Sequence, residues 1–354
     1  MIAPTFAGTM LAAMAILCFV GLLFIGSMLL PGRLEAGAPR PEGGVLRYRL
    51  NGLLLFLLTV AAAGLAELAG WRLGRLIEQF WNLLIAANAL AFLLSFLLVW
   101  TGRKVRPPGL ASFWYGAVRD PSLFGIDLKL FSYRPSLIGL MLICIGCAAY
   151  QLETSGGVTL AMGLWLLMVG LYLFNYFQFE HGMLFTWDII EERFGWMLVW
   201  GDYVLVPFFY GLPGLVLAMT GGDASLPLAI ACTALYLFGF WLFRGANQQK
   251  HAFRRDRSAA IWGRPARAIG DRLLVSGFWG IGRKLNYTGE ICIYLAWTIP
   301  AALASPVALL LPFWLISLLV HRAARDDRRC RAKYGPLWEE YCRAARFRMI
   351  PFLY

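Results

Sequence analysis

Long apolar stretches recur along this chain from one end to the other, and they restrict what it can fold into. A helix of about 20 apolar residues spans the hydrocarbon layer of a bilayer, whereas a helix in a soluble domain needs only one apolar face. The sequence therefore predicts an all-α, polytopic membrane protein with about nine to ten transmembrane helices. The runs cover residues 6–30, 51–70, 80–101, 135–152, 157–178, 198–219, 225–243, 288–303 and 304–321.

The composition agrees with this class and excludes a soluble one. Of the 354 residues, 60% are apolar and only 15% are charged, and the mean hydropathy is +0.64. A soluble protein of this length could not hide so much apolar surface from water. Between the runs, we interpret 31–50 as a Pro/Gly-rich connector and 102–134 as a long polar connection.

Positive charge is confined to one side of the predicted bundle. The formal net charge is +12, and every Lys and Arg except Arg72 and Arg75 falls in alternate connections. By the positive-inside rule this side, with the C-terminus, faces the cytoplasm. The charge therefore indicates orientation and attraction to anionic lipid, and no nucleic-acid partner is expected. The Ala/Arg/Leu-rich usage favours a bacterial inner membrane, while a eukaryotic protein of this kind would occupy the endoplasmic reticulum.

The last hundred residues carry more basic and aromatic side chains than orientation requires. The segments are NQQKHAFRR (Asn247 to Arg255), LLVSGFWGIGRKLNYTGE (Leu273 to Glu290) and HRAARDDRRCRAKYGPLWEEYC (His321 to Cys342). Lys and Arg suit phosphates, and Trp and Tyr suit flat heterocycles. We therefore predict a site for a polyanionic, aromatic cofactor such as a reduced dinucleotide phosphate. Because the glycines lack Rossmann spacing, side chains must hold this cofactor.

We expect one integral membrane domain over 1–354. Residues 1–243 would form the helical bundle with the substrate pocket, and 244–354 the cofactor-binding half, with its pocket at the cytosolic face. The CxxC of Cys144 and Cys147 lies within an apolar run, where packing explains it better than redox chemistry. The three histidines have no ligand spacing, so no metal site is expected.

Polar side chains inside the apolar runs are candidates for function, because they are costly in hydrocarbon. Glu67 and Asp202 are two of them. Tyr172 and Asn175 stand three residues apart and therefore on one helical face. They could line a pocket, or they could be ordinary interfacial residues, and the sequence leaves both interpretations open.

Several segments also resemble the membrane sterol reductase family, which includes the delta-14, delta-7 and 24(28) reductases and the lamin B receptor. The resemblance runs over most of the chain and is most specific in the C-terminal blocks. It implies NADPH-dependent reduction of a carbon–carbon double bond in a sterol or related polycyclic lipid. The similar segments are YRLNGL (Tyr48 to Leu53), GIDLKLFSYRPSLIG (Gly125 to Gly139), FTWDIIEERFGWMLVWGDYVLVPFFY (Phe185 to Tyr210), LLVSGFWGIGRKLNYTG and HRAARDDRRCRAKYGPLWEEYC.

The resemblance implies roles for individual residues. Catalytic roles fall on Tyr172 and Asp326, and Lys250 and Arg254, with Arg325, would select the 2′-phosphate of NADPH. The implied cofactor contacts are Lys250, Arg254, Leu274, Trp279, Asn286, Tyr287, Arg325, Asp326, Cys330, Lys333, Tyr334 and Tyr341.

The implied chemistry begins with a proton. An isolated alkene is a poor hydride acceptor, so we expect protonation of one carbon and hydride transfer to the cation that results, in a dry pocket. Tyr172 is the expected proton donor. Because a phenol with a pKa of about 10 is a weak acid, Asp326, Glu180 or a bound water would have to assist it.

Three positions depart from the family pattern. Lys284 follows Arg283 where the family often has His, Glu290 follows Gly289 where it often has Asp, and Asn175 stands where Asp is common. The double bond attacked therefore stays open, as does the oligomeric state. Two alternatives also remain: an enzyme similar to isoprenylcysteine carboxyl methyltransferases that uses S-adenosylmethionine, and a non-catalytic sterol-binding scaffold.

Overall fold

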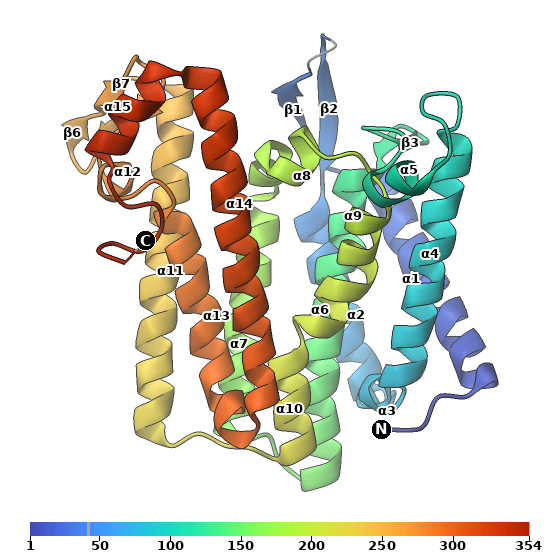
Figure 1. Cartoon of the computed structure of the whole chain (residues 1–354). Coiled ribbons are helices and arrows are strands. Elements are labelled where there is room, and N and C mark those ends of the chain that lie inside the picture. The colour runs from blue at the N-terminus through green and yellow to red at the C-terminus, as the bar shows by residue number, and fades with distance from the viewer. Residues whose placement is uncertain (41–42, 354) are drawn as a thin grey trace. The chain divides into compact units, whose positions relative to one another are not determined.

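The computed structural model describes residues 1–40 and 43–353, which form two compact units, Met1–Gly221 and Gly222–Tyr354 (Figure 1). The predicted all-α, polytopic class is confirmed. Within the described residues, seven helical segments are long and apolar enough to cross a membrane. The predicted total of nine to ten spans stays a prediction, as does the functional division at residue 243. The seven segments are Phe6–Leu29, Phe80–Thr101, Leu128–Ser155, Leu160–Gln178, Trp196–Thr220, Leu226–Arg255 and Pro306–Tyr334.

The N-terminal unit is built around the long helix α6 (Leu128–Ser155), which packs against α1, α2, α3, α7, α10 and the π-helix η2. Its apolar window is the most buried of the seven, at 72%. The other elements of this unit are α1 (Phe6–Leu29), β1 (Arg33–Pro39), β2 (Val45–Leu50), α2 (Gly52–Leu68), α3 (Arg75–Glu78), α4 (Phe80–Thr101), α5 (Leu110–Tyr115), β3 (Ser122–Leu123), β4 (Ile126–Asp127), α7 (Leu160–Gln178), η1 (Glu180–Phe185), α8 (Trp187–Ile190), α9 (Trp196–Trp200), η2 (Gly201–Phe209) and α10 (Leu212–Thr220).

Helix α6 begins earlier than the predicted run at residue 135. The carboxylate of Asp127 accepts the Leu130 N–H at 2.9 Å and caps the helix at its N-terminus. Its first turns bury two cations, and each has an acidic partner. Lys129 Nζ lies 2.9 Å from Asp120 Oδ1, and Arg134 Nη2 lies 2.9 Å from Glu180 Oε1. A hydropathy pattern omits these charged turns although they are helical.

The segment interpreted as a connector forms a β-hairpin instead. Strands β1 and β2 pair antiparallel, with Arg33 opposite Leu50 and Glu35 opposite Tyr48. The amide of Asn51, at the start of α2, donates to two carbonyls at the end of α1 and fastens the base of the hairpin. The hairpin therefore emerges directly from two apolar helices (Figure 1).

The C-terminal unit consists of three long helices that run side by side, α11 (Leu226–Arg255), α13 (Leu285–Ala304) and α14 (Leu310–Tyr334) (Figure 1). The backbones of α11 and α13 nearly touch. A Cβ on Gly289 would lie 2.6 Å from the Gly239 carbonyl oxygen and 2.5 Å from the Phe243 nitrogen. Small residues permit this close packing. The remaining elements of this unit are β5 (Ala260–Ile261), β6 (Arg264–Pro265), β7 (Ala268–Ile269), β8 (Leu273–Leu274), α12 (Phe278–Ile281), η3 (Pro306–Leu309) and α15 (Pro336–Ala344).

Candidate functional site

The site predicted for the cofactor lies where α11 ends in the C-terminal unit. Lys250 and Arg254 stand one turn apart on α11 and so share a helical face. The ammonium of Lys250 lies 4.3 Å from the centroid of the Trp279 ring, a distance suited to cation–π attraction. The Trp279 indole N–H donates to the Ala246 carbonyl at 2.8 Å, so the ring is held against α11.

A tight turn presents Trp279 to α11. Gly277 has φ +62°, and a Cβ at this position would collide with the Gln249 amide oxygen. The same oxygen accepts the Phe278 N–H at 2.9 Å and fixes the start of α12. Glycine is therefore required here both by its backbone conformation and by the close approach of Gln249.

Asp326, on α14, has several cations of this unit around it. Lys284 Nζ makes a direct ion pair with Asp326 Oδ2. Burial alone would lower the pKa of Lys284, but attraction to the Asp326 carboxylate outweighs burial and raises that pKa above its ordinary value. Lys250 and Arg254 are also within electrostatic range of Asp326. Several cations therefore surround one carboxylate and leave a local surplus of positive charge.

Asn286 offers a hydrogen-bond acceptor in the same region. Its amide nitrogen donates to Asn247 Oδ1 at 3.3 Å. Its side-chain oxygen is buried and accepts no hydrogen bond within the part of the chain that the structure describes. Because an unsatisfied buried acceptor costs about 1–3 kcal/mol, a ligand with an N–H or O–H donor fits this position.

The rest of the predicted cofactor residues divide into two groups. Leu274 and Tyr341 are 5% and 4% exposed and belong to core clusters, so their role is to pack the core next to the site. Burial raises the pKa of the Tyr341 phenol, which stays protonated. Around Asp326 and at the end of α14 lie the others. These are Tyr287, within electrostatic range of Lys284; Arg325, beside Asp326; Cys330, one turn further on; Lys333, exposed; and Tyr334, which stacks on Trp338.

The sequence analysis missed the contacts that hold the C-terminal segment against the start of α13. Arg283 donates through its backbone N–H to the Phe347 carbonyl at 2.9 Å and through Nη1 to the Ala345 carbonyl at 2.8 Å. Asp327 Oδ2 lies 3.7 Å from Arg283 Nη2 and 2.6 Å from Arg348 Nε. The only signal in the sequence was the neighbouring pair of Asp residues within a basic run.

Tyr172, the predicted proton donor, belongs to the N-terminal unit. Its side chain is 6% exposed, and its ring centroid lies 6.0 Å from that of Tyr176. Glu180, named as a possible assistant, already accepts from Arg134 and from the Gly52 N–H at 3.0 Å. Both its oxygens are therefore engaged at the junction of α2, α6 and η1. The structure describes Tyr172 and Asp326 in separate units, and their joint role stays a prediction.

Comparison with known proteins gives matches over nearly the whole chain. The sequence profile described as "Ergosterol biosynthesis ERG4/ERG24 family" matches residues 9–354. The Delta(14)-sterol reductase of Arabidopsis thaliana is 35% identical over 344 residues, which cover 94% of this chain and 93% of that protein. The Delta(14)-sterol reductase of Methylotuvimicrobium alcaliphilum is 41% identical over 339 residues, which cover 92% of this chain and 79% of that protein. Delta(14)-sterol reductase TM7SF2 of Mus musculus is 36% identical over 355 residues, which cover 96% of this chain and 85% of that protein.

Proposed function

Because the chain belongs to the ergosterol biosynthesis ERG4/ERG24 family, we propose that it reduces a carbon–carbon double bond of a sterol with NADPH as the reductant. The resemblance to membrane sterol reductases is thereby confirmed. The delta-14 bond is the first candidate, since the relatives above are named for it, and the delta-7 and 24(28) bonds are the alternatives.

The observation that carries the cofactor assignment is the convergence of cations and an aromatic ring on one end of the C-terminal unit. Lys250 and Arg254 would meet the phosphates, and the Trp279 ring, held by Ala246, would meet a flat group. The buried oxygen of Asn286 suits an amide N–H such as that of nicotinamide. The residues therefore fit a dinucleotide phosphate, which when bound supplies a hydride.

The proton must come from the chain itself or from a water that it holds. Tyr172 is buried, so it would deliver its proton into a site that excludes bulk water. A phenol with an ordinary pKa of about 10 needs an assisting group to donate at neutral pH. Both oxygens of Glu180 are engaged and Asp326 is paired with Lys284, so a bound water is the better assistant.

The alternatives stand differently after these comparisons. A methyltransferase-like enzyme would belong to another family, and a match over residues 9–354 leaves it without support. A non-catalytic sterol-binding scaffold stays as the competing function. We further propose that the C-terminus is cytoplasmic and that the protein lies in a bacterial inner membrane.

The test is turnover by the full chain in detergent, supplied with NADPH and a mixture of delta-14, delta-7 and 24(28) unsaturated sterols. Mass spectrometry should show that one component gains two hydrogen atoms, which also identifies the bond. Lys250→Ala and Arg254→Ala should raise the KM for NADPH far more than that for NADH, while Arg255→Ala, on the same last turn of α11, should change neither. NADPH binding without reduction of any sterol would favour the scaffold.

A further inference from the structure

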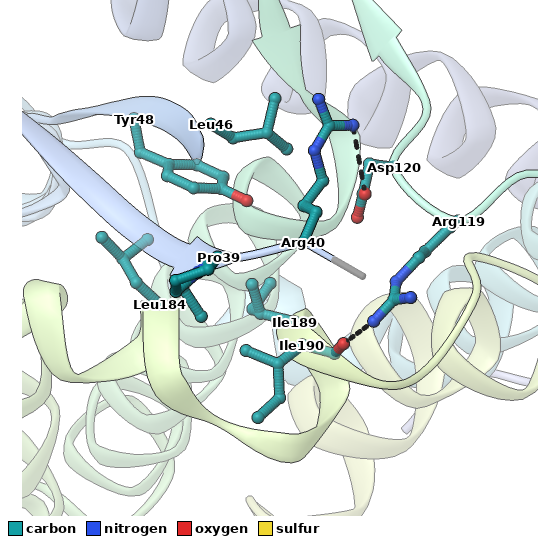
Figure 2. Close-up of a pocket in the computed structure, with 10 residues that line it drawn as sticks. Pro39, Arg40, Leu46, Tyr48, Arg119, Asp120, Leu184, Ile189 and Ile190 are labelled. Carbon is teal, nitrogen blue, oxygen red and sulfur yellow. Dashed lines mark hydrogen bonds and ion pairs between the residues drawn. The ribbon is translucent and has the colours of Figure 1, made fainter. Parts of the chain in front are cut away.

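A small cavity lies in the N-terminal unit, and none of the residues that line it is assigned to the cofactor or to proton transfer. Figure 2 shows it between the β1–β2 hairpin, the segment before β3, and α8. Arg40, Tyr48, Arg119, Asp120 and Ile190 are among its walls. Its volume of about 20 Å³ exceeds the roughly 10–15 Å³ that one water needs. It is too small for a sterol, a dinucleotide or a whole phosphate, and it has room for about one water or one oxygen atom of a larger group.

The one carboxylate that lines this cavity, that of Asp120, is already paired with a buried lysine. Asp120 Oδ1 lies 2.9 Å from Lys129 Nζ, and the Lys129 side chain is only 1% exposed. Lys129 also donates to the carbonyls of Ile189 at 2.8 Å and Glu192 at 3.0 Å, so it is fully engaged. Arg40 is a more distant partner of Asp120, at 3.8 Å. The charges of Arg40 and Arg119 therefore leave the cavity wall with a positive surplus.

The donors around the cavity are held in place but are not all used. Arg40 Nε is buried and donates to no acceptor within the described residues. One Nη of Arg119 donates to the Ile190 carbonyl, which fixes the guanidinium at the cavity edge (Figure 2). Two guanidinium groups that line the same small cavity suit an oxygen of a phosphate or carboxylate.

The Tyr48 hydroxyl points into the same space (Figure 2). Burial raises the pKa of this phenol, and the carboxylates of Asp127 and Asp120 raise it further. Tyr48 therefore keeps its proton at neutral pH and remains a hydrogen-bond donor. Asp127 does not line the cavity; its Oδ1 caps α6, while its Oδ2 is buried and accepts no hydrogen bond within the described residues.

The cavity lies next to the ends of several apolar helices. The hairpin begins four residues after the apolar helix α1 ends at Leu29, and it is followed at once by the apolar α2. Its other walls precede α6 and follow α7, both candidate spans. Basic pockets at the cytoplasmic ends of transmembrane helices are suited to anionic lipid head groups. We propose that this cavity receives one phosphate oxygen of an anionic phospholipid, with the rest of the lipid outside the cavity.

The proposal is tested with delipidated full-length protein in neutral detergent. The probes are dioctanoyl-phosphatidylglycerol, dioctanoylglycerol, which has no phosphate, and inorganic phosphate. Binding is followed by the shift in the melting temperature and by lipid retention in native mass spectrometry. Phosphatidylglycerol should bind and stabilise the protein, whereas dioctanoylglycerol should not. Removing one charge-assisted donor in Arg40→Gln should weaken this binding about tenfold.

Two further variants keep the test specific to the cavity. Tyr48→Phe removes only a hydroxyl and should weaken binding less than Arg40→Gln does. Arg47→Gln removes an exposed cation from the same hairpin and should leave the affinity unchanged. Equal binding by Arg40→Gln, or equal loss with Arg47→Gln, would overturn the site. Stabilisation by inorganic phosphate equal to that by the lipid would instead show a free-phosphate site, and no stabilisation by either probe would remove the proposal.

Discussion

The ion pair between Lys284 and Asp326 gives a prediction whose size follows from the structure. The two side chains are 9% and 24% exposed, so Lys284→Met leaves a largely buried carboxylate without its contact partner. Breaking a buried pair costs about 3–5 kcal/mol, and the exposed quarter of Asp326 places this one near 3 kcal/mol. For a chain of 354 residues, with an unfolding entropy of about 2.1 cal/mol/K per residue, this lowers the melting temperature by roughly 4 °C.

The assay is thermal unfolding of the purified chain in neutral detergent, followed by tryptophan fluorescence. Arg328→Met is the matched control, because Arg328 is an exposed cation on the same helix as Asp326. This variant should unfold within about 1 °C of the unmodified chain, as exposed charges usually contribute little. Equal melting temperatures for Lys284→Met and Arg328→Met would show that the pair does not stabilise the fold.

The same pair predicts a pH dependence in Lys284→His. Asp326 should raise the pKa of the new imidazole above its ordinary value of about 6.5. A group whose pKa is higher in the folded state stabilises fully below its unfolded pKa and stops stabilising as the pH rises through its folded pKa. The variant should therefore match the unmodified chain near pH 5.5 and approach Lys284→Met near pH 9. Lys284 itself, with its pKa raised, keeps its charge over this range. A deficit independent of pH would refute the reasoning.

Three more substitutions test other parts of the structure. Tyr172→Phe should abolish sterol reduction while cofactor binding persists, whereas the equally buried Tyr236→Phe should keep both; a near-normal rate in the first variant would place the donor elsewhere. Glu180→Gln removes the charge that pairs with the buried Arg134 and should destabilise the fold by about 3–5 kcal/mol. An unchanged melting temperature in thermal unfolding would contradict this prediction. Gly277→Ala should reduce NADPH affinity by displacing the aromatic turn, and Gly263→Ala, also at positive φ but with open space around it, should not; equal effects would indicate backbone strain alone.

Two of the apolar runs match their helices almost residue by residue. The predicted 6–30 and 80–101 are the helices Phe6–Leu29 and Phe80–Thr101. The prediction for 225–243 ended too early, because α11 continues to Arg255. Hydropathy reports where a helix meets lipid, while the helix itself continues into the polar region. The extension matters, since it carries Lys250 and Arg254.

The assignment of residues to the candidate site stays a prediction, and the sequence did not indicate which of them pair. Lys284 stood out in the sequence only as a departure from a family pattern, yet it forms the direct contact with Asp326. Forty-two positions separate the two residues, so no local spacing could have revealed the pair. Likewise, Glu180 was a possible assistant to Tyr172 in the sequence, and only the fold shows that its oxygens accept from Arg134 and from the Gly52 N–H.

The arrangement of charge at the C-terminal site explains why a polyanion would complete it. Lys250, Arg254 and Lys284 lie around Asp326. Lys284, which contacts Asp326 directly, balances the charge of that carboxylate. Lys250 is repelled by Lys284 and by Arg254, a cost that bound phosphates would offset. Ligand at 100 times its Kd stabilises a fold by about 2.7 kcal/mol, close to the cost assigned to Lys284→Met. If the proposed cofactor binds at these cations, saturating NADPH should therefore return most of the melting temperature lost in that variant, and in Lys250→Ala it should return little.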